Sequence, residues 1–107
     1  MTTPLRTTVL TALRRELQQL LGDQLDRVVL FGSQARGDAR DDSDLDVLVV
    51  MREAFDYGEL IRRTSSIVSR LSLEYDVVIS RAFATRDQFE REQSPFFLNV
   101  RREGVLV

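Results

Sequence analysis

The sequence predicts an α/β fold in which a small β-sheet is covered by helices. Segments with apolar residues at helical spacing alternate with short apolar runs along the whole chain. The 107 residues, of which 43% are hydrophobic and 30% charged, suffice for one compact domain. No linker, repeat or low-complexity tract divides the sequence. We therefore expect residues 1–107 to form a single domain.

The first expected element is a helix over residues 5–21. Thr3 and Pro4 suit the cap and first turn of a helix, and Gly22 suits the position just past its end. Between them, apolar residues recur at helical spacing and predict one buried face. These apolar residues are Leu5, Val9, Leu10, Ala12, Leu13, Leu17, Leu20 and Leu21.

Short apolar runs predict three strands, over residues 27–31, 45–51 and 75–80. Asp56, with Glu59 three residues later, is typical of a capping box and predicts a helix that runs to about Leu73. After the first strand we expect a short helix, begun by Ser33–Ala35 and ended at Gly37 and Asp38, and then a loop over residues 38–43. After the third strand we expect a short helix capped by Thr85 and another, opened by Ser94 and Pro95, that ends near Gly104. Residues 105–107 are expected to form an edge strand.

Absent residue types exclude several kinds of chemistry. The sequence has no Cys, so disulfides, thiolate nucleophiles and cysteine zinc sites are excluded. It has no His, so neither a Ser-His-Asp triad nor an imidazole metal ligand is possible. Carboxylates, hydroxyls and arginine remain for catalysis, and this set favours hard metal ions with oxygen ligands.

Charge and hydropathy limit the partners. The formal net charge of −2 argues against broad nucleic-acid binding, which needs a basic surface. No apolar run approaches the roughly 20 residues that span a bilayer, and the N-terminus lacks a signal-peptide pattern. We therefore expect a cytoplasmic protein that binds neither membranes nor, directly, nucleic acids.

Residues 30–50 are the most informative about function. Asp44 and Asp46 lie at the head of an apolar run, and residues two apart on a strand point to the same face. Aspartate is depleted in strands, so such a pair costs stability and indicates a functional requirement. Two adjacent carboxylates repel unless a cation lies between them, and Mg²⁺ held by carboxylates and substrate phosphates is the usual reason for such a pair.

Gly32 and Ser33 end the preceding apolar run. A Gly-Ser turn directly after a strand offers backbone N–H groups and a hydroxyl to an anion. Taken alone, such a turn is usually only a turn, and an Asp-rich loop is usually only solvated. A phosphate site combined with metal-binding carboxylates favours nucleotide chemistry.

Asp76 also heads an apolar run, at the start of the expected third strand. If that strand neighbours the one with Asp44 and Asp46, three carboxylates could hold two divalent ions. The alternative is that Asp76 is simply a polar residue where a strand starts. The residues alone favour neither interpretation.

The spacing of Gly32-Ser33, ten residues, and Asp44-Leu45-Asp46 resembles the motif of the nucleotidyltransferase superfamily that includes DNA polymerase β. The string from Phe31 to Gly37, followed by Ser43 to Val47, is most similar to the minimal nucleotidyltransferases of prokaryotes, called MNT proteins. The resemblance implies a mixed sheet flanked by helices, like the palm of polymerase β.

The resemblance also implies roles for individual residues. Asp44, Asp46 and Asp76 would bind two Mg²⁺ ions and take part in catalysis. Gly32 and Ser33 would hold the triphosphate of ATP.

Arg36 lies within the same motif and is the candidate for stabilising the leaving pyrophosphate. The alternative is a structural role, in which Arg36 pairs with Asp38 or Asp42 and braces the loop. Both interpretations stay open.

MNT proteins are often encoded beside HEPN-domain proteins as toxin–antitoxin pairs. Some transfer AMP from ATP to a tyrosine of the HEPN toxin and so silence its RNase activity. Nothing in these residues supplies a separate acceptor-binding domain, which agrees with a protein partner that supplies the acceptor. The resemblance therefore implies a Mg²⁺-dependent protein adenylyltransferase that serves as an antitoxin.

Two alternatives to this function stay open. In the first, the chain is a non-catalytic antitoxin that blocks the HEPN RNase by direct binding. In the second, it transfers a nucleotide to a small molecule such as an aminoglycoside, which would require an acceptor pocket.

Overall fold

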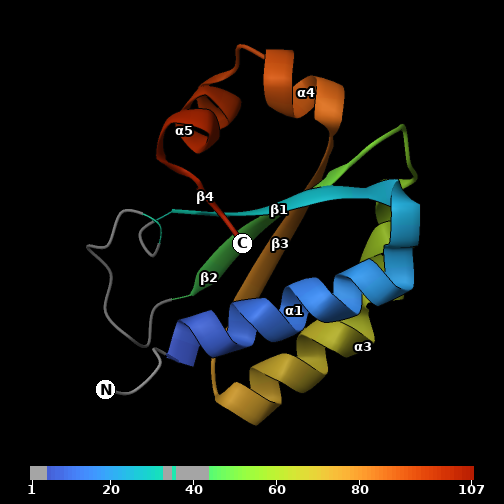
Figure 1. Cartoon of the computed structure of the whole chain (residues 1–107), viewed down its shortest axis with the longest axis vertical. Helices are drawn as coiled ribbons and strands as arrows, with labels where there is room; N and C mark the ends of the chain where they lie inside the picture. The colour runs from blue at the N-terminus through green and yellow to red at the C-terminus, as the bar shows by residue number, and fades with distance from the viewer. Residues whose placement is uncertain (1–4, 33–34, 36–43) are drawn as a thin grey trace.

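The computed structural model describes residues 5–32, 35 and 44–107 (Figure 1). In chain order the elements are α1 (Leu5–Leu21), the 3-10 helix η1 (Gly22–Gln24), β1 (Leu25–Phe31), β2 (Leu45–Met51), α3 (Tyr57–Tyr75), β3 (Ile79–Thr85), α4 (Arg86–Arg91), α5 (Pro95–Glu103) and β4 (Val105–Leu106). The strands form one sheet in the order β3-β2-β1-β4. β1 is antiparallel to β2 and β4, whereas β2 and β3 are parallel, so the predicted mixed sheet is confirmed.

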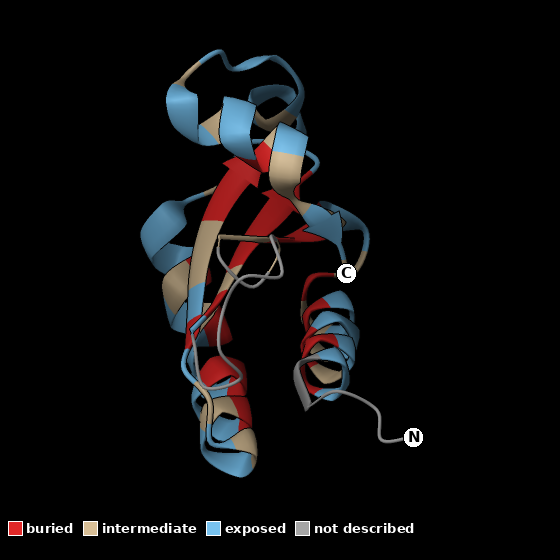
Figure 2. Cartoon of the chain, turned by 90° about the vertical axis from the view of Figure 1, so that its left-hand side faces the viewer, coloured by how far each residue is buried: buried red, intermediate tan, exposed pale blue. Residues whose placement is uncertain are grey.

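Helices cover both faces of this sheet. α1 and α3 pack on one face, and α4 and α5 cover part of the other (Figure 1). Along β2, Val47 and Val49 face α1 and α3, while Leu48 and Val50 face α5. Because β2 is buried on both faces, its sequence is a continuous apolar run rather than an alternating one. Buried residues concentrate in the strands, and the outer faces of the helices are exposed (Figure 2).

The predicted helix starts are confirmed by their caps. The Asp56 carboxylate accepts a hydrogen bond from the Glu59 backbone N–H at 3.0 Å, which fixes the start of α3. Thr85 and Gln88 form a reciprocal capping box at the start of α4. Pro95 occupies the first turn of α5. α1 spans the predicted residues 5–21.

The third strand begins later than the sequence predicted. α3 continues to Tyr75, and Asp76 is its C-cap residue, with φ 52° and ψ 53°. The backbone N–H of Asp76 donates to the Ser72 carbonyl, so the residue closes a helix instead of opening a strand. The helix gains this last turn because Tyr75 packs against the main core. The predicted strand over residues 75–80 is therefore wrong, and β3 starts at Ile79.

Two further predictions concern the C-terminus and the segment after Gly32. The edge strand near the C-terminus is confirmed as β4, which pairs with β1. The predicted short helix and loop after Gly32 lie outside the described residues, except that Ala35 is helical. Of the helices in the described ranges, none is both long and apolar enough to cross a membrane.

Candidate functional site

The two motif carboxylates lie where β2 begins. The Cα partners of Asp46 are Phe31 on β1 and Ser80 on β3. These three residues therefore share the sheet face that α5 covers farther along the strands. Asp44 precedes the strand and is exposed, whereas Asp46 is half-buried.

Gly32 brings the turn after β1 against one of these carboxylates. Its φ of +77° lies in the left-handed region that favours glycine. A Cβ atom at this position would lie 2.6 Å from the Asp46 Oδ2 atom, so a side chain here would force one of the two residues to shift. The backbone of the turn and the Asp46 carboxylate therefore form one site. Ser33 and Arg36, predicted to act in this site, lie outside the described residues.

Asp46 carries a charge that the described residues do not compensate. Its pKa is raised, first by burial and second by the charge of Asp44. Asp44 and Asp46 form no ion pair within residues 5–32, 35 and 44–107. The Asp46 carboxylate beside the Gly32 backbone and the nearby carboxylate of Asp44 are a donor set suited to a hard divalent cation such as Mg²⁺. The residues present therefore fit the metal that the motif implies.

The structure does not gather Asp76 with this pair. No three His, Cys, Asp or Glu side chains in the described part of the chain are placed to hold one metal ion. Asp76 nevertheless approaches the same end of the sheet, because the nearby Val78 carbonyl accepts a hydrogen bond from the Leu45 N–H at 2.9 Å. Asp76 is exposed at the end of α3 and remains a predicted ligand only.

A cavity of about 190 Å³ borders the Gly32 turn. Phe31 and Gly32 form one wall, and α5 forms the other with Phe96, Asn99, Val100 and Glu103. Sequence reasoning did not identify Asn99 and Glu103 as residues that line a cavity beside the motif. A possible signal was their helical spacing from Phe96, which puts polar and aromatic side chains on one face of α5.

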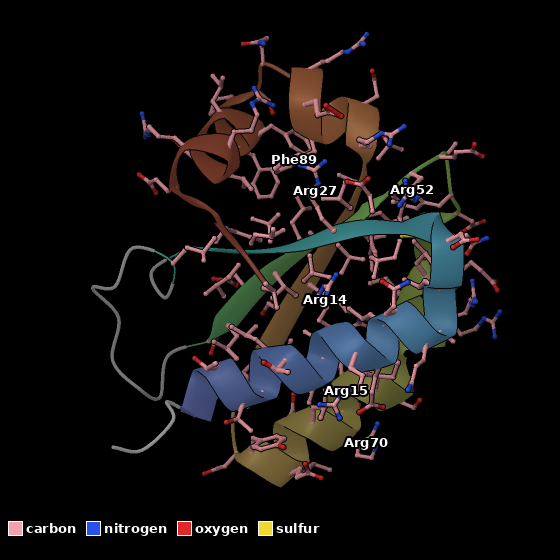
Figure 3. The ribbon with its side chains drawn as sticks, viewed as in Figure 1. Arg14, Arg15, Arg27, Arg52, Arg70 and Phe89 are labelled. Carbon is pink, nitrogen blue, oxygen red and sulfur yellow. The ribbon has the colours of Figure 1, made fainter. Side chains whose placement is uncertain are left out.

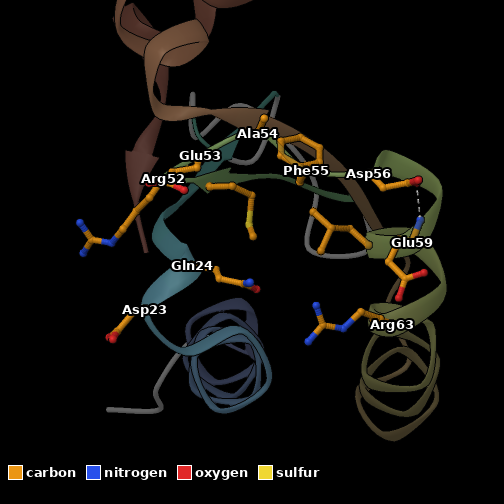
Figure 4. Close-up of a pocket in the computed structure, with 11 residues that line it drawn as sticks. Asp23, Gln24, Arg52, Glu53, Ala54, Phe55, Asp56, Glu59 and Arg63 are labelled. Atoms are coloured by element: carbon orange, nitrogen blue, oxygen red, sulfur yellow. Dashed lines mark hydrogen bonds between the residues drawn. The ribbon is translucent and has the colours of Figure 1, made fainter.

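A larger cavity, of about 400 Å³, lies at the opposite end of β2, where residues from η1 face α3 (Figure 4). Arg63 and Glu59 line it from α3, and Asp23 and Gln24 line it from η1. The Arg63 guanidinium donates to the Leu20 carbonyl at 3.3 Å, which links α3 to α1. This cavity contains none of the motif residues, so it is separate from the Asp44–Asp46 site.

The fold and the site define a domain of the nucleotidyltransferase class. The profile of the nucleotidyltransferase domain family matches residues 10–104, and the chain belongs to this family. Within it, the chain is similar to the minimal nucleotidyltransferases.

Curated relatives support the narrower similarity. A candidate protein adenylyltransferase of Methanocaldococcus jannaschii is 42% identical over 72 residues, which are 67% of this chain and 72% of the relative. The protein adenylyltransferase MntA of Thermococcus cleftensis is 34% identical over 71 residues, 66% of this chain and 70% of the relative.

Solved structures agree with the fold. A candidate minimal nucleotidyltransferase superposes with a TM-score of 0.59 at 27% identity, covering 98% of this chain and 97% of the other. A chain from a toxin–antitoxin structure with AMP-PNP superposes with a TM-score of 0.54 at 20% identity, covering 86% of this chain and 69% of the other. At that identity the second match shows the shared fold alone.

Proposed function

We propose that this chain transfers AMP from ATP to a tyrosine of a HEPN-domain toxin and thereby serves as its antitoxin. The observation that carries the proposal is the Asp46 carboxylate, which lies against Gly32 and close to Asp44 and whose charge is uncompensated among the described residues. Relatives named as protein adenylyltransferases support protein as the acceptor.

Asp44 and Asp46 would hold Mg²⁺, and Asp76 is the candidate for a third ligand. When bound, the metal neutralises charge on the phosphates of the nucleotide. The backbone N–H groups of the Gly32-Ser33 turn would bind the β- and γ-phosphates, and Arg36 would face the leaving pyrophosphate. The number of ions follows the family resemblance, which implies two.

The transfer itself is a displacement at the α-phosphorus of ATP. The tyrosine hydroxyl oxygen attacks the α-phosphorus in line and forms a new P–O bond. The bond from this phosphorus to the oxygen bridging to the β-phosphate breaks, and pyrophosphate leaves with that electron pair. The hydroxyl proton passes to a nearby base, for which Asp76 is the candidate, and then to water. Catalysis is mainly positioning and charge stabilisation, as in other phosphoryl transfers.

The test is to incubate the chain with ATP labelled at the α-phosphate, MgCl₂ and a candidate HEPN-domain partner protein. Label is expected on the partner, and mutation of the partner's acceptor tyrosine to Phe should abolish it. The Asp44→Asn, Asp46→Asn double variant should lose at least about 100-fold in transfer rate, which corresponds to about 2.7 kcal/mol in the barrier. Asp23→Asn, an exposed acid at the other end of β1, is the matched control and should keep the full rate.

Three results separate the alternatives. Inhibition of the toxin without label on it would favour a non-catalytic antitoxin that acts by binding. Label on an aminoglycoside but not on the partner would favour small-molecule transfer. Full transfer by the double variant would show that the two carboxylates are not the catalytic site.

A further inference from the structure

We propose that the cavity between the Gly32 turn and α5 receives the purine base of the nucleotide. This inference rests on the proposed function, since it assigns a subsite next to the triphosphate site. The residues that would contact the base are Phe96, Asn99 and Glu103 of α5, with Phe31 of β1.

The first argument is position. Phe31 is the Cα partner of Asp46, and Gly32 contacts the Asp46 carboxylate. The cavity is lined by both Phe31 and Gly32, so it begins where the metal and phosphate site ends. A nucleotide whose α-phosphate lies at Asp46 can therefore place its nucleoside toward α5.

The second argument is the aromatic wall. The rings of Phe31 and Phe96 meet edge to face, with centroids 5.3 Å apart and an interplanar angle of 84°. Phe97 contacts Phe96 in the same way at 5.1 Å and so also restricts its ring. Phe96 nevertheless stays 41% exposed. An aromatic ring that is held in place but not covered is a platform on which a base can stack.

The third argument is the polar edge of the cavity. Asn99 and Glu103 lie three and seven residues after Phe96, on the same face of α5. The Asn99 Oδ1 atom accepts from the Arg102 guanidinium at 3.0 Å, which orients the amide so that its NH₂ group remains a donor. The Glu103 carboxylate accepts from the Arg102 guanidinium at 3.5 Å, and its two oxygens can accept further hydrogen bonds. Adenine presents an amino donor beside a ring-nitrogen acceptor, and these match the carboxylate and the amide.

The experiment compares binding of ATP with binding of inorganic tripolyphosphate, which lacks the nucleoside. Both are titrated into the full chain with MgCl₂ by calorimetry. Phe96→Leu keeps an apolar side chain against Phe31 and removes the aromatic face. It should weaken ATP binding about tenfold and leave tripolyphosphate binding unchanged. Asn99→Ala should also weaken ATP binding selectively.

Two controls accompany these variants. Phe96→Tyr keeps the ring and should bind ATP as the wild type does. Leu98→Ala changes an exposed apolar residue of α5 that does not line the cavity, and it should bind both ligands normally.

The outcomes separate the two proposals. If Phe96→Leu and Asn99→Ala bind ATP as tightly as the wild type, the base subsite is wrong while the proposed function stands. Equal weakening of ATP and tripolyphosphate also contradicts the base subsite, because the effect then lies in the phosphate site. If the wild type binds neither ligand, the proposed function and the subsite both fail.

Discussion

Asp26 and Asp46 lie near opposite ends of the antiparallel pair β1–β2 and show two ways of placing a carboxylate in this fold. The Asp26 side chain is 8% exposed and lies 2.5 Å from the Arg27 Nε atom, with guanidinium nitrogens of Arg86 and Arg52 at 3.7 and 3.9 Å. Asp46 has no such partner among the described residues. Figure 3 shows Arg27 and Arg52 on the side of β1 where α4 lies.

This difference distinguishes a carboxylate that stabilises the fold from one that is available to bind a ligand. Asp26 lies at an irregularity in the pairing of β1 with β2, and three arginines from separate segments compensate its charge. The Arg27 guanidinium is held in addition over the Phe89 ring, 5.0 Å from its centroid (Figure 3). Compensation of this kind stabilises the fold. A carboxylate without it is available to bind a ligand.

The largest expected difference in stability between two matched variants comes from exchanging each acid for alanine. Asp26→Ala leaves three guanidinium groups close together without their shared acceptor. It should lower the free energy of unfolding by about 1–2 kcal/mol, allowing for the partial exposure of the arginines. Asp46→Ala removes an uncompensated charge and should leave stability within about 0.5 kcal/mol of the wild type. Urea denaturation of metal-free protein measures both values.

The same two variants should show the opposite order when AMP transfer is measured instead of stability. Asp26→Ala should retain AMP transfer at a temperature where it is folded, whereas Asp46→Ala should lose it. An Asp46→Ala variant destabilised as much as Asp26→Ala would mean that Asp46 serves the fold.

The next effect concerns two glycines with positive φ. Gly22 has φ +57° and no atom within 4 Å of a built Cβ, so Gly22→Ala should cost only the strain of the left-handed conformation, about 1 kcal/mol. Gly32→Ala adds the contact with Asp46 Oδ2 and should cost about 1 kcal/mol more. Thermal unfolding of the two variants measures the difference.

A double variant tests the cause of that difference. Adding Asp46→Ala to Gly32→Ala removes the atom that the new methyl group would meet. The extra cost should then disappear, whereas its persistence would place the strain in the backbone alone.

The smallest expected effect is a pH dependence. Because the folded-state pKa of Asp46 is raised, the folded chain holds this proton more tightly than the unfolded chain. Stability from this group is therefore greatest below its ordinary pKa and falls as pH rises through the raised value. The difference in unfolding free energy between wild type and Asp46→Asn, measured from pH 3 to pH 7, should follow that sign. An opposite slope would mean that a compensating charge lies close to Asp46.

Local patterns predicted most of the fold. β2 begins at Leu45 as predicted, because a strand buried on both faces leaves a continuous apolar run. The starts of α3 and α4 follow from Asp56 and Thr85, since a helix cap is formed by adjacent residues. These features require no knowledge of the tertiary structure.

Features that depend on distant contacts could not be predicted in this way. Arg81 interrupts the apolar pattern of β3, and its guanidinium is satisfied by the Thr64 hydroxyl at 2.8 Å and by the Ile61 carbonyl at 2.9 Å, both on α3. From the sequence alone, Asn99 is typical of a solvated residue on a surface helix. Only the three-dimensional structure shows that it lines a cavity together with Gly32. Gly32 and Asp46 could therefore be named from one motif, whereas the cavity beside Gly32 depends on a helix far along the sequence.

The left-handed backbone at Asp76 has a consequence for mutagenesis. Among the described non-glycine residues, Asp76 is the one with a positive φ, and it lies in the turn that leads from α3 to β3. Replacing Asp76 by alanine removes the carboxylate and also disfavours the left-handed backbone conformation. An alanine variant would therefore not separate the loss of the carboxylate from the strain in the turn. Asparagine tolerates that conformation nearly as well as aspartate does. The amide is therefore the replacement that reports on the proton-accepting group alone.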